Sequence, residues 1–215
     1  ALAVAMAYPF VISAQSESHA PSQEAGVVTV VSRQPTSLPT QIPATMEGLS
    51  AAQIAQSINA TDSEDALKYF PSLLVRKRYA GDYNHAVLSS RASGTGNSTR
   101  SAVYADGILL SNYLGNGVSG LSFPPRWGMV TPEEIERVDV LYGPFSAAYP
   151  GNSVGGVVLM TTHMPTRFEA HARLDAFGEN YKLYGTDKNF SGAHGAATLG
   201  NKAGDWSFWL SADRL

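Results

Sequence analysis

Histidines and paired carboxylates are the residues of this 215-residue chain that could do acid–base or metal chemistry. No two histidines have the i, i+4 spacing of a helical metal site, and the chain has no cysteine to complete a Cys/His group. The adjacent acids Glu64-Asp65 and Glu133-Glu134 fall in the first turns of predicted helices, where negative charge favours the helix dipole without catalysis. No Gly-x-Ser-x-Gly elbow is present. We therefore expect no enzyme activity, cofactor or metal site. The histidines are His19, His85, His163, His171 and His194.

One glycine string matches a nucleotide-binding motif by its letters alone. Gly115-x-Gly117-x-x-Gly120 has the spacing of the dinucleotide fingerprint. That fingerprint needs a helix N-terminus directly after it, so that backbone amides meet the phosphates. Phe123-Pro124-Pro125 follows instead, and we interpret the glycines as turn residues.

The overall composition narrows the class of protein. A formal net charge of −3 argues against a nucleic-acid partner, which needs a basic face. The absence of cysteine excludes a disulfide framework and a thiolate nucleophile. The length accommodates one or two domains of roughly 100 to 200 residues each.

The first 20 residues predict an exported protein. Residues 1–14 are apolar and uncharged, and polar sequence follows at once. A membrane-spanning helix needs about 20 apolar residues, whereas the core of a signal peptide needs about 7 to 15 and ends in small residues. We interpret residues 1–20 as a signal peptide that lacks its first residues, with cleavage after Ala14 or Ala20. The competing interpretation is a buried core helix.

Residues 21–45 are rich in Ser, Gln, Thr and Pro and predict a flexible linker. The β-branched run at residues 24–32 interrupts it with strong strand propensity. This run either adds an edge strand to the following domain or binds the sheet edge of a partner, where main-chain hydrogen bonds provide the affinity.

Residues 46–130 predict short helices and short strands. Ser50 with Gln53 forms a capping box for a helix over residues 51–57, and Thr61 with Glu64 forms another for a helix that ends at Phe70. The predicted strands are residues 73–75, 86–90 and 101–105, with a turn at Asp106-Gly107 into residues 108–110. Residues 93–99 and 111–127 are predicted loops.

Residues 131–162 predict a short helix, a strand, a double turn and a second strand. Thr131, Pro132 and Glu134 form a capping box with proline at the first helical position. Residues 137–142 alternate with the period of a half-buried strand. Glycine and proline residues then mark turns up to Asn152, and the apolar run at residues 154–160 predicts a buried strand.

From Phe168 onward the chain alternates strictly between apolar and polar residues. One face carries Phe168 and Leu174, and the other carries Arg173 and His171. Residues 206–213 repeat this alternation, and residues 181–199 hold an intervening strand bounded by turns at residues 178–180 and 200–204. A soluble half-buried sheet and a membrane wall both show this pattern. In a membrane wall, Arg173 would face the lumen because lipid contact costs it about 2 to 4 kcal/mol.

Residues 135–162, IERVDVLYGPFSAAYPGNSVGGVVLMTT, resemble the end of the plug domain of TonB-dependent outer-membrane receptors. The stretches SEDALKYFPSLLVRKR (residues 63–78) and VYADGI (residues 103–108) also resemble that domain. Three departures are local: Tyr142 stands where the family commonly has arginine, Pro150 separates Tyr149 from Gly151, and Ser72 stands where glycine is usual.

The resemblance implies a fold and a role. The fold is a mixed α/β plug, a small mixed sheet with short helices over residues 46–165, followed by the start of an antiparallel transmembrane β-barrel over residues 166–215. It implies the N-terminal part of an outer-membrane transporter of a Gram-negative bacterium for a scarce substrate, a ferric siderophore or other metal chelate above all. His171 and His194 would then be lumen-facing. The alternative is a plug-like binding or interaction module without transport.

The resemblance also assigns partners and residues. Partners are outer-membrane lipid, the chelate, and TonB with its inner-membrane complex. The TonB box is Val27, Val28, Thr29, Val30 and Val31. Loops joining plug strands, called apical loops here, supply the candidate ligand contacts Tyr79, Tyr83, Asn112, Tyr113, Asn116 and Trp127. The residues expected to hold the plug together are Arg137, Asp139, Gly143, Pro144, Tyr149, Gly151, Gly155 and Gly156.

Overall fold

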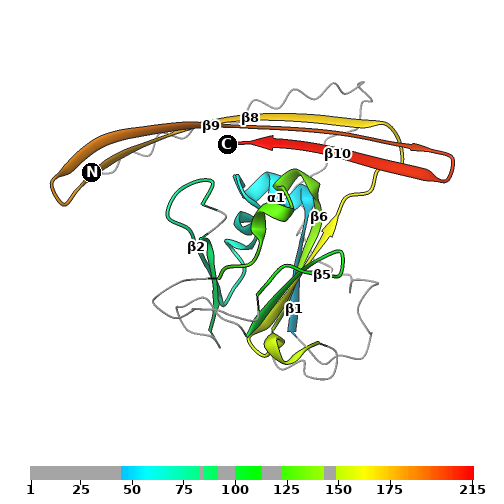
Figure 1. The fold of residues 1–215 in the computed structure, drawn as a ribbon, viewed down its shortest axis with the longest axis horizontal. Helices are drawn as coiled ribbons and strands as arrows, with labels where there is room; N and C mark the ends of the chain where they lie inside the picture. Colours follow the sequence, from blue (N-terminus) through cyan, green and yellow to red (C-terminus); the bar gives the residue numbers. More distant parts are fainter. Residues whose placement is uncertain (1–44, 83–84, 92–99, 113–122, 143–148) are drawn as a thin grey trace, which may run out of the picture.

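The computed structural model describes residues 45–82, 85–91, 100–112, 123–142 and 149–215. These residues form an α/β part, residues 45–165, and a three-stranded sheet that follows it. Figure 1 shows this sheet arching over the end of the α/β part that carries helix α1 (Ala51–Ser57). Within the described residues, no helix is long and apolar enough to cross a membrane.

A five-stranded mixed sheet forms the centre of the α/β part. Its strand order is β1 (Thr45–Ser50), β6 (Ile135–Tyr142), β7 (Gly156–Thr162), β4 (Ser101–Ala105) and β5 (Ile108–Leu109). Only the β4 and β7 pair is parallel. The predicted strands at residues 101–105 and 137–142 are confirmed, whereas the last strand begins at Gly156 and not at Val154.

Strand β6, which lies between β1 and β7, is buried on both faces. Val138 and Val140 join the main core, which also contains Trp127. Leu141 lies on the opposite face in a smaller cluster with Ala102 and Val157. A strand that is covered on two sides needs apolar residues at successive positions, and that explains why the alternation of β6 is incomplete.

Helix α1 begins where its capping box predicts. The Ser50 backbone N–H donates to Gln53 Oε1 at 2.9 Å, and the Gln53 backbone N–H donates to Ser50 Oγ at 3.4 Å. The next helix differs from the prediction. It is a 3₁₀ helix, η1 (Ser63–Leu67), capped by Asp62 with Asp65, so the expected Thr61 and Glu64 capping box is wrong.

At the capping position, the Asp62 backbone N–H donates to Asp65 Oδ2 at 3.2 Å, while the Asp62 carboxylate accepts from Lys77 and from the Gly81 backbone N–H. The shift by one residue places Glu64 inside the protein. The helix also ends earlier than expected, at Leu67, although Phe70 remains buried in the core.

The remaining short elements connect the sheets. Strands β2 (Leu73–Arg76) and β3 (Val87–Ser90) pair antiparallel as a separate two-stranded sheet. The 3₁₀ helix η4 (Pro132–Glu134) has the capping box predicted at Thr131. Two further 3₁₀ helices are η3 (Trp127–Met129) and η5 (Gly151–Ser153).

The three-stranded sheet is an antiparallel meander of long strands. These are β8 (Glu169–Leu183), β9 (Thr186–Ala203) and β10 (Trp206–Arg214). The turn predicted at residues 178–180 is wrong, because those residues pair with residues 189–191 of β9. The chain reverses at Tyr184-Gly185, whose φ angles of 51° and 80° fit a two-residue type I′ turn. The second turn is at Gly204, inside the range predicted for it.

The two faces of this sheet differ in polarity, as the alternation predicts. Leu174 is 77% exposed and Trp206 is 82% exposed, and both lie on the face turned away from the α/β part. Arg173 lies on the opposite face, where its Nη2 donates to Asn59 Oδ1 at 2.6 Å. The polar face therefore lies against the α/β part, and His194 is buried on it.

Candidate functional site

The loop between β2 and β3, residues 77–86, is organised around a buried carboxylate. Asp82 Oδ2 accepts from the Arg78 backbone N–H at 3.0 Å and from Arg78 Nε at 2.9 Å. Asp82 Oδ1 accepts from Arg78 Nη2 at 3.1 Å and lies 3.0 Å from His85 Nδ1. The hydrogen bonds from Arg78 are the main reason that the pKa of Asp82 falls to about 2. Asp82 is therefore a permanent anchor for two side chains that reach solvent.

Three exposed groups surround this anchor. The side chains of Arg78 and His85 are 61% and 55% exposed. Tyr79 is 58% exposed, and the Arg78 guanidinium lies 5.7 Å from its ring centroid. The loop thus presents a guanidinium, an imidazole and an aromatic ring to solvent, a set suited to an anionic or aromatic ligand.

A largely buried cluster of three acids and Lys77 contacts the same loop. Lys77 Nζ binds Asp62 Oδ2 at 2.8 Å and Asp65 Oδ2 at 2.7 Å, and Asp62 Oδ2 also accepts from the Gly81 backbone N–H at 2.9 Å. Glu64 lies beside these groups, with its Oε1 3.9 Å from Lys77 Nζ.

Glu64 is fully buried, and neither of its carboxyl oxygens has a hydrogen-bond partner among the described residues. Burial, followed by the charge of Asp62, raises the pKa of Glu64 to about 8. The group is therefore mostly protonated at neutral pH. The sequence assigned Glu64 to a helix cap and gave no signal of this burial.

The residues expected to contact the ligand differ in how far they are exposed to solvent. Tyr79 is exposed, as a ligand contact must be. Asn112 is half-buried, and its Nδ2 donates to the Pro124 carbonyl at 2.9 Å. Tyr83, Tyr113 and Asn116 lie outside the described residues, as do Gly143, Pro144 and the whole segment from Val27 to Val31.

Trp127 does not fit the role expected of it. Its side chain is fully buried, and its Nε1 donates to the Ala86 carbonyl at 3.0 Å. Its own carbonyl accepts from Ser63 Oγ at 2.9 Å. Trp127 therefore joins η1 to the loop before β3 as a core residue and offers no surface to a ligand. The glycines and prolines near it in the sequence predicted a loop, but they did not show that the loop packs its indole inward.

Several of the residues predicted to hold the plug together lie near the face of the five-stranded sheet that carries the small cluster of Ala102, Leu141 and Val157. Arg137 Nε donates to both carboxylate oxygens of Asp139 at 2.8 Å, and Asp139 is 1% exposed. The Tyr149 ring lies 6.0 Å from that of Tyr104, and the Gly155 backbone N–H donates to the Arg100 carbonyl at 2.6 Å. Gly151 begins η5, and Gly156 begins β7 with a φ of 142°.

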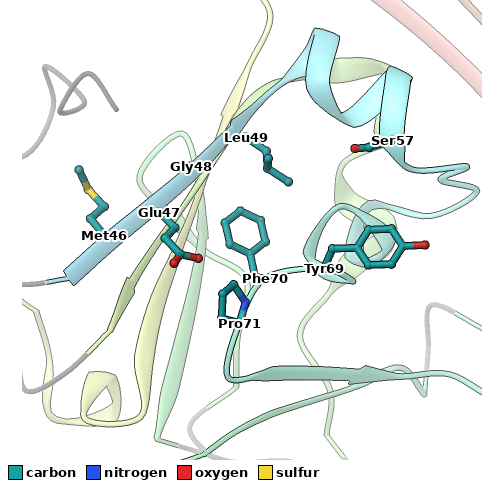
Figure 2. A pocket seen from close by; sticks show the side chains of 8 residues that line it. All are labelled: Met46, Glu47, Gly48, Leu49, Ser57, Tyr69, Phe70 and Pro71. Carbon is teal, nitrogen blue, oxygen red and sulfur yellow. The ribbon is translucent and has the colours of Figure 1, made fainter. Parts of the chain in front are cut away.

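A pocket lies along the outer edge of β1, with a volume of about 510 Å³. Figure 2 shows Glu47 and Leu49 on the side of β1 that faces Phe70 and Pro71. Tyr142, which replaces the arginine common in the resembling sequences, donates from its hydroxyl to Glu47 Oε2 at 3.4 Å. Burial raises the pKa of Tyr142, so the hydroxyl keeps its proton. Among the described residues, no group of three His, Asp or Glu side chains could hold a metal ion.

Together, the mixed sheet with its short helices and the amphipathic antiparallel meander facing it define the class of a plug with the start of a barrel wall. Comparison with known proteins agrees. The sequence model described as the TonB-dependent Receptor Plug Domain matches residues 39–157, more than half of the chain. The chain belongs to this family.

Solved structures show the same fold. The ferric citrate transporter FecA in its unliganded form matches 79% of the chain with a TM-score of 0.58 and 20% identity. A mutant of the ferric enterobactin receptor PfeA from Pseudomonas aeruginosa, in complex with enterobactin, matches 81% with a TM-score of 0.54 and 20% identity. The FrpB iron transporter from Neisseria meningitidis matches 78% with a TM-score of 0.54 and 17% identity. The chain spans 25%, 25% and 23% of these three proteins respectively, so it corresponds to about a quarter of each.

Proposed function

We propose that this chain supplies the plug and the first wall strands of an outer-membrane receptor that takes up a metal chelate, a ferric siderophore above all, in a Gram-negative bacterium. The observation that carries the proposal is the orientation of the three-stranded sheet. Its polar face meets the plug and its apolar face turns outward, with Leu174 and Trp206 exposed there. This orientation suits a wall with lipid outside and a plugged lumen inside.

The Asp82 loop is the proposed chelate contact within the described residues. A ferric siderophore offers an anionic and often aromatic surface, and Arg78, Tyr79 and His85 offer groups that bind such a surface. Two proteins with the same fold, the ferric citrate transporter FecA and the enterobactin-bound receptor PfeA, support this substrate class. Asn112, Tyr83, Tyr113 and Asn116 remain proposed neighbours of the same ligand.

Energy for uptake would come through TonB. The segment from Val27 to Val31 would add a strand to a sheet of TonB in the periplasm, as its β-branched composition suits. Pulling on this segment would act on β1, which begins at Thr45, and so on the central sheet.

Chelate-dependent growth under iron limitation tests this function. Cells that lack the receptor gene should fail to grow on the one ferric chelate it carries, with ferric citrate and ferric enterobactin as the first candidates. Re-expression of the receptor should restore growth. Chelate binding to the outer membrane with no receptor-dependent growth would instead identify a binding module without transport.

A further inference from the structure

A cluster of charged side chains joins the plug to the wall at one place. Arg173 of β8 contacts the plug twice, through Asn59 and through Glu133 of η4, whose Oε1 lies 3.7 Å from Arg173 Nη1. Arg173 Nε also binds Asp175 Oδ2 at 2.7 Å. This cluster therefore includes groups from both parts of the molecule.

His194 of β9 lies at the centre of the cluster, and its side chain has no exposed surface. Its Nδ1 lies 3.1 Å from Asp175 Oδ2, and its Nε2 is hydrogen-bonded to Asp213 Oδ2 of β10. A neutral imidazole can donate from only one nitrogen. Both contacts are hydrogen bonds to carboxylates only when His194 carries a proton on each nitrogen. The neutral form would turn a lone pair toward one of the two carboxylates.

Glu133 brings a buried carboxyl group from the plug side. Both of its carboxyl oxygens are buried without a hydrogen-bond partner among the described residues. Burial raises the pKa of Glu133, and the charges of Arg173, His194 and Asp213 act on it. Its only ion pair within the described part of the chain is the long one with Arg173.

The charges of the cluster balance only when His194 and Glu133 are both protonated. Arg173 and a protonated His194 provide two positive charges, which match Asp175 and Asp213 once Glu133 is neutral. Loss of the proton from either His194 or Glu133 leaves an uncompensated negative charge between plug and wall. Buried charge without a partner strongly destabilises the contact that contains it.

We propose that His194, Glu133 and Arg173 form a proton-dependent latch that holds the plug against the wall, and that deprotonation of the cluster loosens it. The charged groups facing His194 are Arg173 and Asp175 from β8, Asp213 from β10 and Glu133 from η4. The latch rests on the wall assignment within the proposed function and not on the identity of the chelate or on TonB.

A single introduced cysteine can detect opening of the latch, because residues 1–215 contain no cysteine. Any cysteine elsewhere in the full-length receptor would first be replaced by serine. Ser211 Oγ of β10 lies 3.2 Å from Thr131 Oγ1 of the plug, so the plug partly covers a Ser211→Cys thiol while the latch is closed. The full-length receptor carrying this cysteine would be labelled with a maleimide in detergent micelles. Labelling of an Asp205→Cys receptor, with its cysteine in the exposed turn after β9, corrects for the pH dependence of the thiol reaction itself.

The corrected labelling rate at Ser211→Cys should rise about tenfold between about pH 5.5 and pH 8.5. His194→Gln should abolish this rise, whereas His171→Gln, at an exposed histidine of β8, should retain it. Glu133→Gln, which keeps the shape of the side chain but not its charge, should slow labelling at the higher pH. If His194→Gln does not fold, Glu133→Gln decides the test.

A parent receptor whose corrected labelling does not change with pH would overturn the latch. So would a full pH response that persists in both His194→Gln and Glu133→Gln. The labelling experiment measures no transport. Either result would therefore leave the proposal of chelate uptake unaffected, and the growth experiment tests that proposal separately.

Discussion

Gly48 pairs directly with Asp139 across β1 and β6, and a Cβ atom at Gly48 would occupy the space of the Asp139 carboxylate. Arg137 lies against the same spot, with its Nη2 2.7 Å from Asp139 Oδ1. The first strand of the plug thus leaves room for the ion pair between Arg137 and the buried Asp139 carboxylate on the strand beside it. Its glycine has a packing role that needs no unusual backbone angle.

Gly48→Ala should destabilise the plug by about 2 to 4 kcal/mol, because it displaces Asp139 from Arg137 and leaves a buried carboxylate without its partner. The change is measured as the shift of the urea denaturation midpoint of the purified receptor, monitored by a fluorescence signal from the plug. Gly178→Ala is the matched control, since its new Cβ would meet only the Phe190 carbonyl at 3.8 Å. Equal midpoints for the two variants would rule out this role for Gly48.

Glu64 should make the plug less stable as the pH rises. Its pKa is about 8 in the folded protein and 4.5 ordinarily, so between these values the folded state binds more protons than the unfolded state. The contribution of this group to stability should therefore be greatest below about pH 4.5 and fall up to about pH 8, by on the order of 5 kcal/mol in all. Glu64→Gln should flatten that part of the stability profile, and a slope identical to that of the parent would contradict the burial of an ionisable group there.

Trp127→Phe should cost about 1 to 3 kcal/mol of stability, because it removes the hydrogen bond to Ala86 inside the core and leaves the carbonyl unpaired. The folded variant should bind chelate with unchanged affinity, since the indole has no exposed surface. Thermal unfolding and chelate titration on the same sample separate the two effects. A loss of affinity with unchanged stability would return Trp127 to the ligand contacts.

Asp82→Asn should weaken chelate binding by about tenfold, because Arg78 and His85 lose the charged anchor that positions them. Tyr79→Ala should also weaken binding, but it should change stability by less than about 0.5 kcal/mol because the ring is exposed. Equilibrium binding of the chelate identified by growth provides the measurement. Unchanged affinity in both variants would exclude the loop as the contact.

Local signals in the sequence predicted local structure well. The capping boxes at Ser50 and Thr131 and the existence of strand β6 each depend on neighbours within a few residues, and the structure confirms them. The half-buried pattern predicted for β6 is wrong, because both of its faces are buried. The start of η1 was predicted one residue too early, because Thr61 and Asp62 are both suitable N-cap residues. The burial of Ser63 and Glu64 accompanies the start that the structure shows.

Contacts between distant residues could not be predicted in the same way. Trp127 is hydrogen-bonded to Ala86, 41 residues away in the sequence, and Thr131 is hydrogen-bonded to Ser211, 80 residues away. Nothing near Gly178 shows that β8 continues past it, because the pairing with β9 determines where the hairpin turns. The family could be recognised from the closing segment of the plug, whereas the groups that hold plug and wall together required the structure.

Val28→Pro is the decisive variant for the proposal that TonB drives uptake through the segment from Val27 to Val31. Proline removes a backbone donor from the proposed added strand, whereas the control Val28→Thr keeps both the donor and the β-branched shape. Radiolabelled ferric chelate would be followed in cells, with binding measured in the cold and uptake measured on warming. We predict that Val28→Pro binds chelate like the parent but takes up none, and that Val28→Thr does both. Normal uptake by Val28→Pro would show that this segment does not couple the receptor to TonB.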